Sequence, residues 1–175
     1  AGNFEVSLKI ESRWVQPERC TGCGLCAEVC PIEVPDEFNE GLQNRKAIYV
    51  RTPQAIPNVY TIDRDRCTKC SKCVEICPTS AVDFDLADES RELPVGAIIV
   101  STGFEEFNAV KMGQYGFGRY PNVLTSIRLE RMLGAGGPSA GKLVRPSDGK
   151  APQKIAFLQC VGSRDMERNY CSAAC

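Results

Sequence analysis

The sequence predicts an α+β protein in two parts: a small domain built from two copies of one cysteine-rich unit, and an α/β segment behind it. The stretches CTGCGLCAEVCP and CTKCSKCVEICP share all four cysteines, and they begin 47 residues apart, at Cys20 and Cys67. Behind the second copy, apolar runs alternate with one amphipathic segment, which is typical of α/β structure. We therefore expect a lead-in strand at residues 1–14, the duplicated domain at 15–92 and the α/β segment at 93–175.

The composition excludes several classes of function. The chain of 175 residues has 21 basic and 22 acidic side chains, so no strongly charged surface for nucleic acid or membrane lipid is expected. No apolar stretch of about 20 residues could cross a membrane, and no secretory signal is visible. There are 11 cysteines and no histidine, which removes imidazole ligands and histidine general bases. These features predict a cytoplasmic protein.

The ends of the chain suggest that it is part of something longer. It begins with Ala1 rather than Met and ends on Cys175. We interpret it as a piece of a larger protein, with a processed N-terminus as the alternative.

In the first part, short strands are expected around the two cysteine-rich stretches. Residues 4–14 alternate loosely between apolar and polar side chains, as a strand does. Residues 47–50 and 59–62 are β-prone runs separated by a proline-containing segment. Residues 33–44 are acidic and interrupted by a proline and a glycine, so we expect a short helix or a loop there.

In the second part, two apolar runs predict buried strands. Residues 95–100 (VGAIIV) suit a strand that is buried on both faces, and a Ser-Thr-Gly turn signal follows. Residues 155–158 form a similar run that leads into Cys160. Between them, residues 127–133 predict an amphipathic helix, followed by a loop rich in Gly, Pro and Ser over 134–152.

The cysteine spacing predicts the chemistry of the duplicated domain. Each copy reads C-x2-C-x2-C-x3-C-P. Three cysteines at this spacing wrap one corner of an iron–sulfur cubane, and in two-cluster ferredoxins the fourth ligates the other cluster. The sequence therefore predicts a bacterial-type ferredoxin domain with two [4Fe-4S] clusters and crossed ligands. The first set is Cys20, Cys23, Cys26 and Cys77. The second set is Cys67, Cys70, Cys73 and Cys30.

Other uses of these cysteines are weaker interpretations. Structural zinc also uses C-x2-C pairs, but it has no need of a third cysteine at the same spacing. A disulfide framework would normally accompany secretion. Electron transport is therefore the leading function, and the alternatives are an iron–sulfur redox sensor and an interaction module.

The two loops differ in charge. The second loop carries Lys69 and Lys72, whereas the first has no lysine. Because positive charge stabilises a reduced cluster, this difference favours a higher redox potential at the cluster of the second loop.

Three further cysteines lie near the end of the chain, at Cys160, Cys171 and Cys175. Three thiolates cannot complete a four-thiolate site. They are either ordinary thiols, which are often buried, or part of a third cluster site whose fourth ligand lies beyond the chain.

Nearly the whole sequence resembles the A subunit of heterodisulfide reductases, the iron–sulfur flavoprotein of methanogens, and its relatives in sulfate reducers and other anaerobes. The matching stretches are GNFEV, CTGCGLCAEVCP, RKAIYVRTPQAIPNVYTID, CTKCSKCVEICP, GAIIVSTGF, RPSDGK and FLQCVGSRD with YCSAAC. The resemblance implies a ferredoxin domain inserted into a thioredoxin-reductase-like FAD domain, to which residues 1–14 and 93–175 would belong.

The resemblance also implies cofactors. Thr102 and Gly103 match the turn that approaches the flavin. The G-x-G-x-x-G fingerprint for FAD is absent and would lie upstream. The three C-terminal cysteines match ligands of a further [4Fe-4S] cluster in the full-length protein.

In activity, the resemblance implies a flavin-dependent, electron-bifurcating oxidoreductase complex. Its expected partners are the other components of a heterodisulfide reductase complex, a hydrogenase or formate dehydrogenase module, and ferredoxin. No catalytic residue is expected in this segment, and by itself it should show no turnover.

Overall fold

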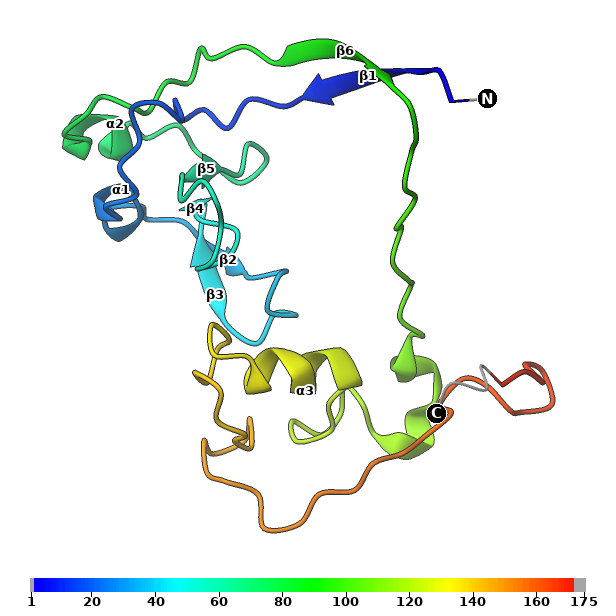
Figure 1. Cartoon of the computed structure of the whole chain (residues 1–175). Helices are drawn as coiled ribbons and strands as arrows, with labels where there is room; N and C mark the ends of the chain where they lie inside the picture. The colour runs from blue at the N-terminus through cyan, green and yellow to red at the C-terminus, as the bar shows by residue number, and fades with distance from the viewer. Residues whose placement is uncertain (1, 172–175) are drawn as a thin grey trace. The chain divides into compact units, whose positions relative to one another are not determined.

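The computed structural model describes residues 2–171 and divides the chain into two compact units, Ala1–Ser101 and Thr102–Cys175. Figure 1 traces the chain through both. The first unit contains both cysteine-rich stretches. Its short helices and small antiparallel sheets are compatible with the predicted α+β class.

A two-stranded ribbon marks where the chain enters and leaves the first unit. Strand β1 (Phe4–Ile10) pairs antiparallel with β6 (Glu89–Val95), so that Phe4 lies opposite Val95 and Ile10 opposite Glu89. In Figure 1 the two strands run side by side in blue and green. The strand predicted at the start of the chain is thereby confirmed, although it ends at Ile10.

Two short helices and two small hairpins lie between the strands of this ribbon. The helices are α1 (Leu25–Glu28) and α2 (Lys72–Ile76), which contact each other. The hairpins are β2 (Glu33–Pro35) with β3 (Asn44–Lys46), and β4 (Ile48–Tyr49) with β5 (Thr61–Ile62). The second hairpin confirms the two β-prone runs that were predicted from the sequence.

The helix considered for residues 33–44 is wrong, because this segment forms the β2–β3 hairpin and its turn. The buried carboxylate of Asp36 accepts hydrogen bonds from the side chains of Asn39, at 2.7 Å, and Gln43, at 3.0 Å. Gly41 closes the turn with a φ of 67°, which favours glycine. Side-chain hydrogen bonds of this kind compete with helix formation.

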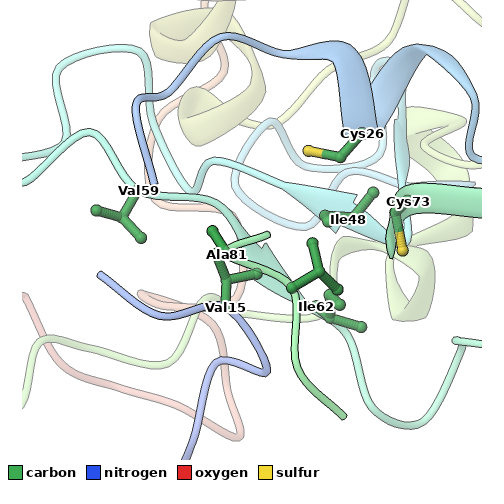
Figure 2. Close-up of a cluster of buried hydrophobic side chains, with 8 residues drawn as sticks. Val15, Cys26, Ile48, Val59, Ile62, Cys73 and Ala81 are labelled. Carbon is green, nitrogen blue, oxygen red and sulfur yellow. The ribbon is translucent and has the colours of Figure 1, made fainter. Parts of the chain in front are cut away.

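The core of the first unit is small and lies between the two cysteine-rich loops. Its largest fully buried side chains are Val15 and Ile48. Val15 pairs with Val82 in an isolated antiparallel bridge that ties the start of the domain to its end. Figure 2 shows the buried cluster, with the side chains of Cys26 and Cys73 projecting in different directions from α1 and α2. The cysteine loops therefore share one apolar centre.

The second unit contains α3 (Ser126–Leu133), which confirms the predicted amphipathic helix. The hydroxyl of Thr125 caps this helix by accepting a hydrogen bond from the backbone N–H of Arg128 at 3.4 Å. Two short 3-10 turns precede it, η1 (Ala109–Lys111) and η2 (Gly113–Tyr115).

The two buried strands predicted for the second part are wrong. Only Val95 of the first run belongs to a strand, and the side chain of Ile99 is 91% exposed. In the second run Phe157 is 66% exposed. An apolar run forms a buried strand only where other strands flank it, and no strand occurs in residues 102–171. The predicted α/β arrangement therefore has no counterpart in this described part.

Candidate metal centre

The two cysteine loops have matching backbone conformations. Immediately after the second cysteine of each motif, Gly24 and Ser71 adopt left-handed conformations, with φ of 90° and 64°, and α1 and α2 begin directly afterwards. Two residues earlier, Gly22 and Lys69 are also left-handed, with φ of 70° and 52°. The duplication in sequence is thus a duplication in local structure.

Glycine at position 22 has a local cause. A Cβ atom there would lie 2.8 Å from both the side-chain nitrogen and the backbone oxygen of Asn58. At the matching position of the second loop, the side chain of Lys69 extends over the ring of Trp14, with its ammonium 4.6 Å from the ring centroid. Only the first loop is therefore restricted to glycine here.

The eight motif cysteines surround two cavities, each partly open to solvent. Each cavity is lined by three cysteines from one motif and by the fourth cysteine of the other motif. The first cavity has Cys20, Cys23, Cys26 and Cys77. The second has Cys67, Cys70, Cys73 and Cys30. These are the two crossed sets that the spacing predicts.

Burial of the cysteines follows the same order in both loops. The second cysteine of each motif is exposed, the third is buried, and the first and fourth are half-buried. Burial raises the pKa of Cys26 to about 12 and that of Cys73 to about 11. Metal ions bind thiolates, so metal binding at these two cysteines would release a proton from each.

Hydrogen bonds to the sulfur atoms are not symmetric. Burial alone would raise the pKa of Cys77, but the N–H of Ala81, 3.3 Å from its sulfur, and the hydroxyl of Thr79 hold that pKa below its ordinary value. In the second set, the N–H of Lys69 donates to the sulfur of Cys67 at 3.4 Å.

The remaining walls of the cavities are mainly apolar. Val15, Val82 and Tyr60 line the first cavity, and Ile48 and Phe84 are among those that line the second. Such walls limit water at a bound cluster and so influence its redox potential. The sequence reasoning missed these residues because nothing in the motif spacing points to them.

The arrangement fits a cage of several atoms better than a single ion. Thiolates on one zinc ion all lie about 2.3 Å from it. Among residues 2–171, no three Cys, Asp or Glu side chains are placed so that they could hold one metal ion. Four sulfurs spread around one cavity instead suit a cubane cluster, in which each thiolate binds a different iron.

Comparisons with known proteins agree with this chemistry. Residues 19–82 match the 4Fe-4S dicluster domain. One of the two iron–sulfur A subunits of the CoB–CoM heterodisulfide reductase of Methanopyrus kandleri is 57% identical over 99% of this chain. The A subunit of the H2/formate:CoB-CoM heterodisulfide, ferredoxin reductase of Methanococcus maripaludis is 54% identical over the same share. The A subunit of the ferredoxin/F420H2-dependent CoB-CoM heterodisulfide reductase of Methanosarcina acetivorans is 45% identical.

The chain belongs to the family of heterodisulfide reductase A subunits. It spans 27% of the length of the first two of these relatives and 22% of the third. The matching dicluster domain supports iron–sulfur clusters in this part of the chain.

The other site residues predicted from the heterodisulfide reductase resemblance lie in the second unit. Cys160 is half-buried, with a φ of 59°, immediately before a turn, Cys171 is exposed, and Cys175 lies outside the described residues. Thr102 and Gly103 are exposed, and Gly103 has a φ of 70° with open space around it. The described residues contain no helix long and apolar enough to span a membrane.

Proposed function

We propose that the two cysteine sets each hold one [4Fe-4S] cluster, and that the domain passes electrons one at a time within a heterodisulfide reductase-like complex. A cluster of this type exchanges a single electron without making or breaking bonds to its ligands. The chain supplies the thiolates, the N–H and hydroxyl donors to sulfur, and the apolar walls.

The observation that carries the proposal is the crossed lining of the two cavities. Cys77 follows α2 in the second motif but lines the cavity of the first, and Cys30 follows α1 but lines the cavity of the second. The two sites therefore share ligand-bearing segments and lie on one core. Two sites that share ligand-bearing segments in this way suit electron transfer better than a sensor with one labile cluster.

For the full-length protein, we propose an FAD cofactor and electron bifurcation. Relatives are named for H2, formate or ferredoxin as electron partners, which supports a hydrogenase or formate dehydrogenase module and ferredoxin as partners here.

Thr102 and Gly103 remain our candidates for flavin contact, and Cys160, Cys171 and Cys175 for a third cluster. Because thiolate ligands persist in reducing compartments, we place this chemistry in the cytoplasm. The segment alone is proposed to have no turnover.

The proposal is tested by iron content combined with paired substitutions. Anaerobically purified protein should contain about eight irons and eight sulfides, since each cubane holds four of each. Removing Cys20 and Cys77 together (Cys20→Ala with Cys77→Ala) should leave about four irons, because both belong to one site. Removing Cys67 and Cys77 together should damage both sites and leave almost none.

The reverse result would contradict the crossed assignment. If the Cys67/Cys77 double variant kept about four irons and the Cys20/Cys77 variant lost all of them, each motif would hold its own cluster. Bound zinc without visible absorbance would contradict electron transfer itself.

A further inference from the structure

The residues that follow the two motifs differ at a position that lines a cavity in both cases. The residue two places after the fourth cysteine is Ile32 in the first motif and Thr79 in the second. Thr79 lines the first cavity and Ile32 lines the second. An apolar and a hydroxyl-bearing side chain therefore occupy matching places at the two sites.

This difference changes the hydrogen-bonding surroundings of the fourth cysteine ligand at each site. The hydroxyl of Thr79 lies 3.6 Å from the sulfur of Cys77, which also accepts from the N–H of Ala81. A thiolate can only accept, so with a cluster bound the hydroxyl is the donor. At the other site, the Cys30 thiol points to the backbone oxygen of Ile32 at 3.9 Å. A thiolate there has no proton to donate, and this oxygen offers it no hydrogen bond.

Hydrogen bonds to sulfur stabilise the added negative charge of a reduced cluster, and this is one of the features that set cluster potentials. The donors that face Cys77 include the Thr79 hydroxyl and the Ala81 N–H, whereas a carbonyl oxygen faces Cys30. The environments of the two fourth ligands thus favour reduction at the first site.

Two other features instead favour reduction at the second site. The N–H of Lys69 donates to Cys67 in the second set, and the second loop carries the charges of Lys69 and Lys72. Both lysines are exposed, and solvent and salt weaken the effect of exposed charges. The ammonium of Lys69 also lies over the ring of Trp14.

We propose that Thr79 is a positioning residue for electron transfer, whose hydroxyl raises the redox potential of the cluster ligated by Cys77 relative to the cluster ligated by Cys30. The inference rests on the proposed function. The step concerned is the transfer of one electron, in which one cluster is oxidised and the other is reduced. Thr79 shifts the equilibrium of this electron transfer so that the electron resides more often on the first cluster.

The test is an anaerobic redox titration of the reconstituted protein, followed by EPR. Thr79→Val removes the hydroxyl and keeps the shape of the side chain, whereas Thr79→Ser keeps the hydroxyl. Ile32→Thr adds a hydroxyl at the matching place of the other site. The Cys20/Cys77 double variant, which keeps only the second cluster, assigns the signals.

Thr79→Val should lower the potential of the first cluster alone. We expect an approximately tenfold shift in the distribution of the electron, equivalent to about 59 mV for one electron. Thr79→Ser should titrate like the unmodified protein, and Ile32→Thr should raise the potential of the second cluster.

Equal potentials for Thr79→Val and Thr79→Ser would overturn the inference, as would an equal shift of both clusters in Thr79→Val. The iron content of the unmodified protein distinguishes a failure of the proposed function from a failure of the inference about Thr79. About eight irons with unmoved potentials would refute only the role of Thr79.

Discussion

At the scale of single residues, the first cysteine loop is most restricted at Gly22. Its left-handed backbone, with a φ of 70°, favours glycine, and the 2.8 Å approach of Asn58 leaves no room for a Cβ atom. We predict that Gly22→Ala lowers the free energy of unfolding of the cluster-loaded protein by about 1–3 kcal/mol, the range for a strained backbone position. The measurement is the urea midpoint at which the visible absorbance of the clusters is lost.

The matching position in the second loop provides the control. Lys69 already adopts a left-handed conformation, with a φ of 52°, so Lys69→Ala adds no new backbone strain. It removes only an exposed contact between the ammonium and the Trp14 ring, which is worth about 0.5–1 kcal/mol. If Lys69→Ala shifted the midpoint as much as Gly22→Ala, the close approach of Asn58 would not be the cause.

At the scale of elements, the β2–β3 hairpin is held to the second cysteine loop by Arg45. Its guanidinium is 2.8 Å from carboxylate oxygens of both Glu37 and Asp63. It also lies 3.9 Å from the centroid of the Tyr49 ring. The backbone oxygen of Asp63 accepts from the N–H of Cys67 at 2.9 Å. Arg45 therefore joins the hairpin to the segment where the second loop begins.

We predict that Arg45→Lys destabilises this hairpin by about 1–3 kcal/mol, because an ammonium cannot reproduce the planar fork or the stacking. Hydrogen exchange should become faster in residues 33–46 and 63–67. Lys46→Ala, which breaks the more exposed ion pair with Glu33, should cost less than about 1 kcal/mol. Equal exchange in the two variants would rule out a special role for Arg45.

The same scale shows where sequence reasoning succeeds. The α3 helix carries its own signals, an apolar periodicity and the Thr125 cap, so it could be predicted from local sequence. The cysteine spacing likewise anticipated which side chains line each cavity. The hairpin at residues 33–46 depends on side-chain hydrogen bonds to Asp36 and on the distant partner Asp63, and no local pattern reports these. Residues 96–100 have strand propensity, but no strand among the described residues pairs with them, so Ile98, Ile99 and Val100 stay exposed.

The site shows the same division between local and distant information. The repeat makes Thr79 and Ile32 equivalent in sequence, so the difference between them is visible in the sequence alone. Which cavity each of these residues lines depends on the fold. Tyr60 lies just before β5 and lines the first cavity, and no sequence pattern indicates this.

At the scale of the whole molecule, the first unit has only a small apolar core, and its cysteines make up much of it. The apolar core consists of a few small and medium side chains, and six of the eight motif cysteines belong to it or pack against it. Domains of this size are marginal unless disulfides or metals support them. We therefore expect the stability of the domain to depend on the proposed clusters, because metal binding is coupled to folding.

We predict that removing iron with a chelator and an oxidant under anaerobic conditions unfolds residues 15–84, because eight thiols would then line two solvent-open cavities in place of the clusters. Amide exchange throughout this range should approach that of an unfolded chain, while exchange in α3, which belongs to the other unit, should remain unchanged. Restoring iron and sulfide should restore protection in both loops together, since each site takes a ligand from the opposite motif. Persistent protection of β4 and β5 in the iron-free protein would mean that Val15, Ile48 and their neighbours suffice as a core, and that the clusters serve electron transfer alone.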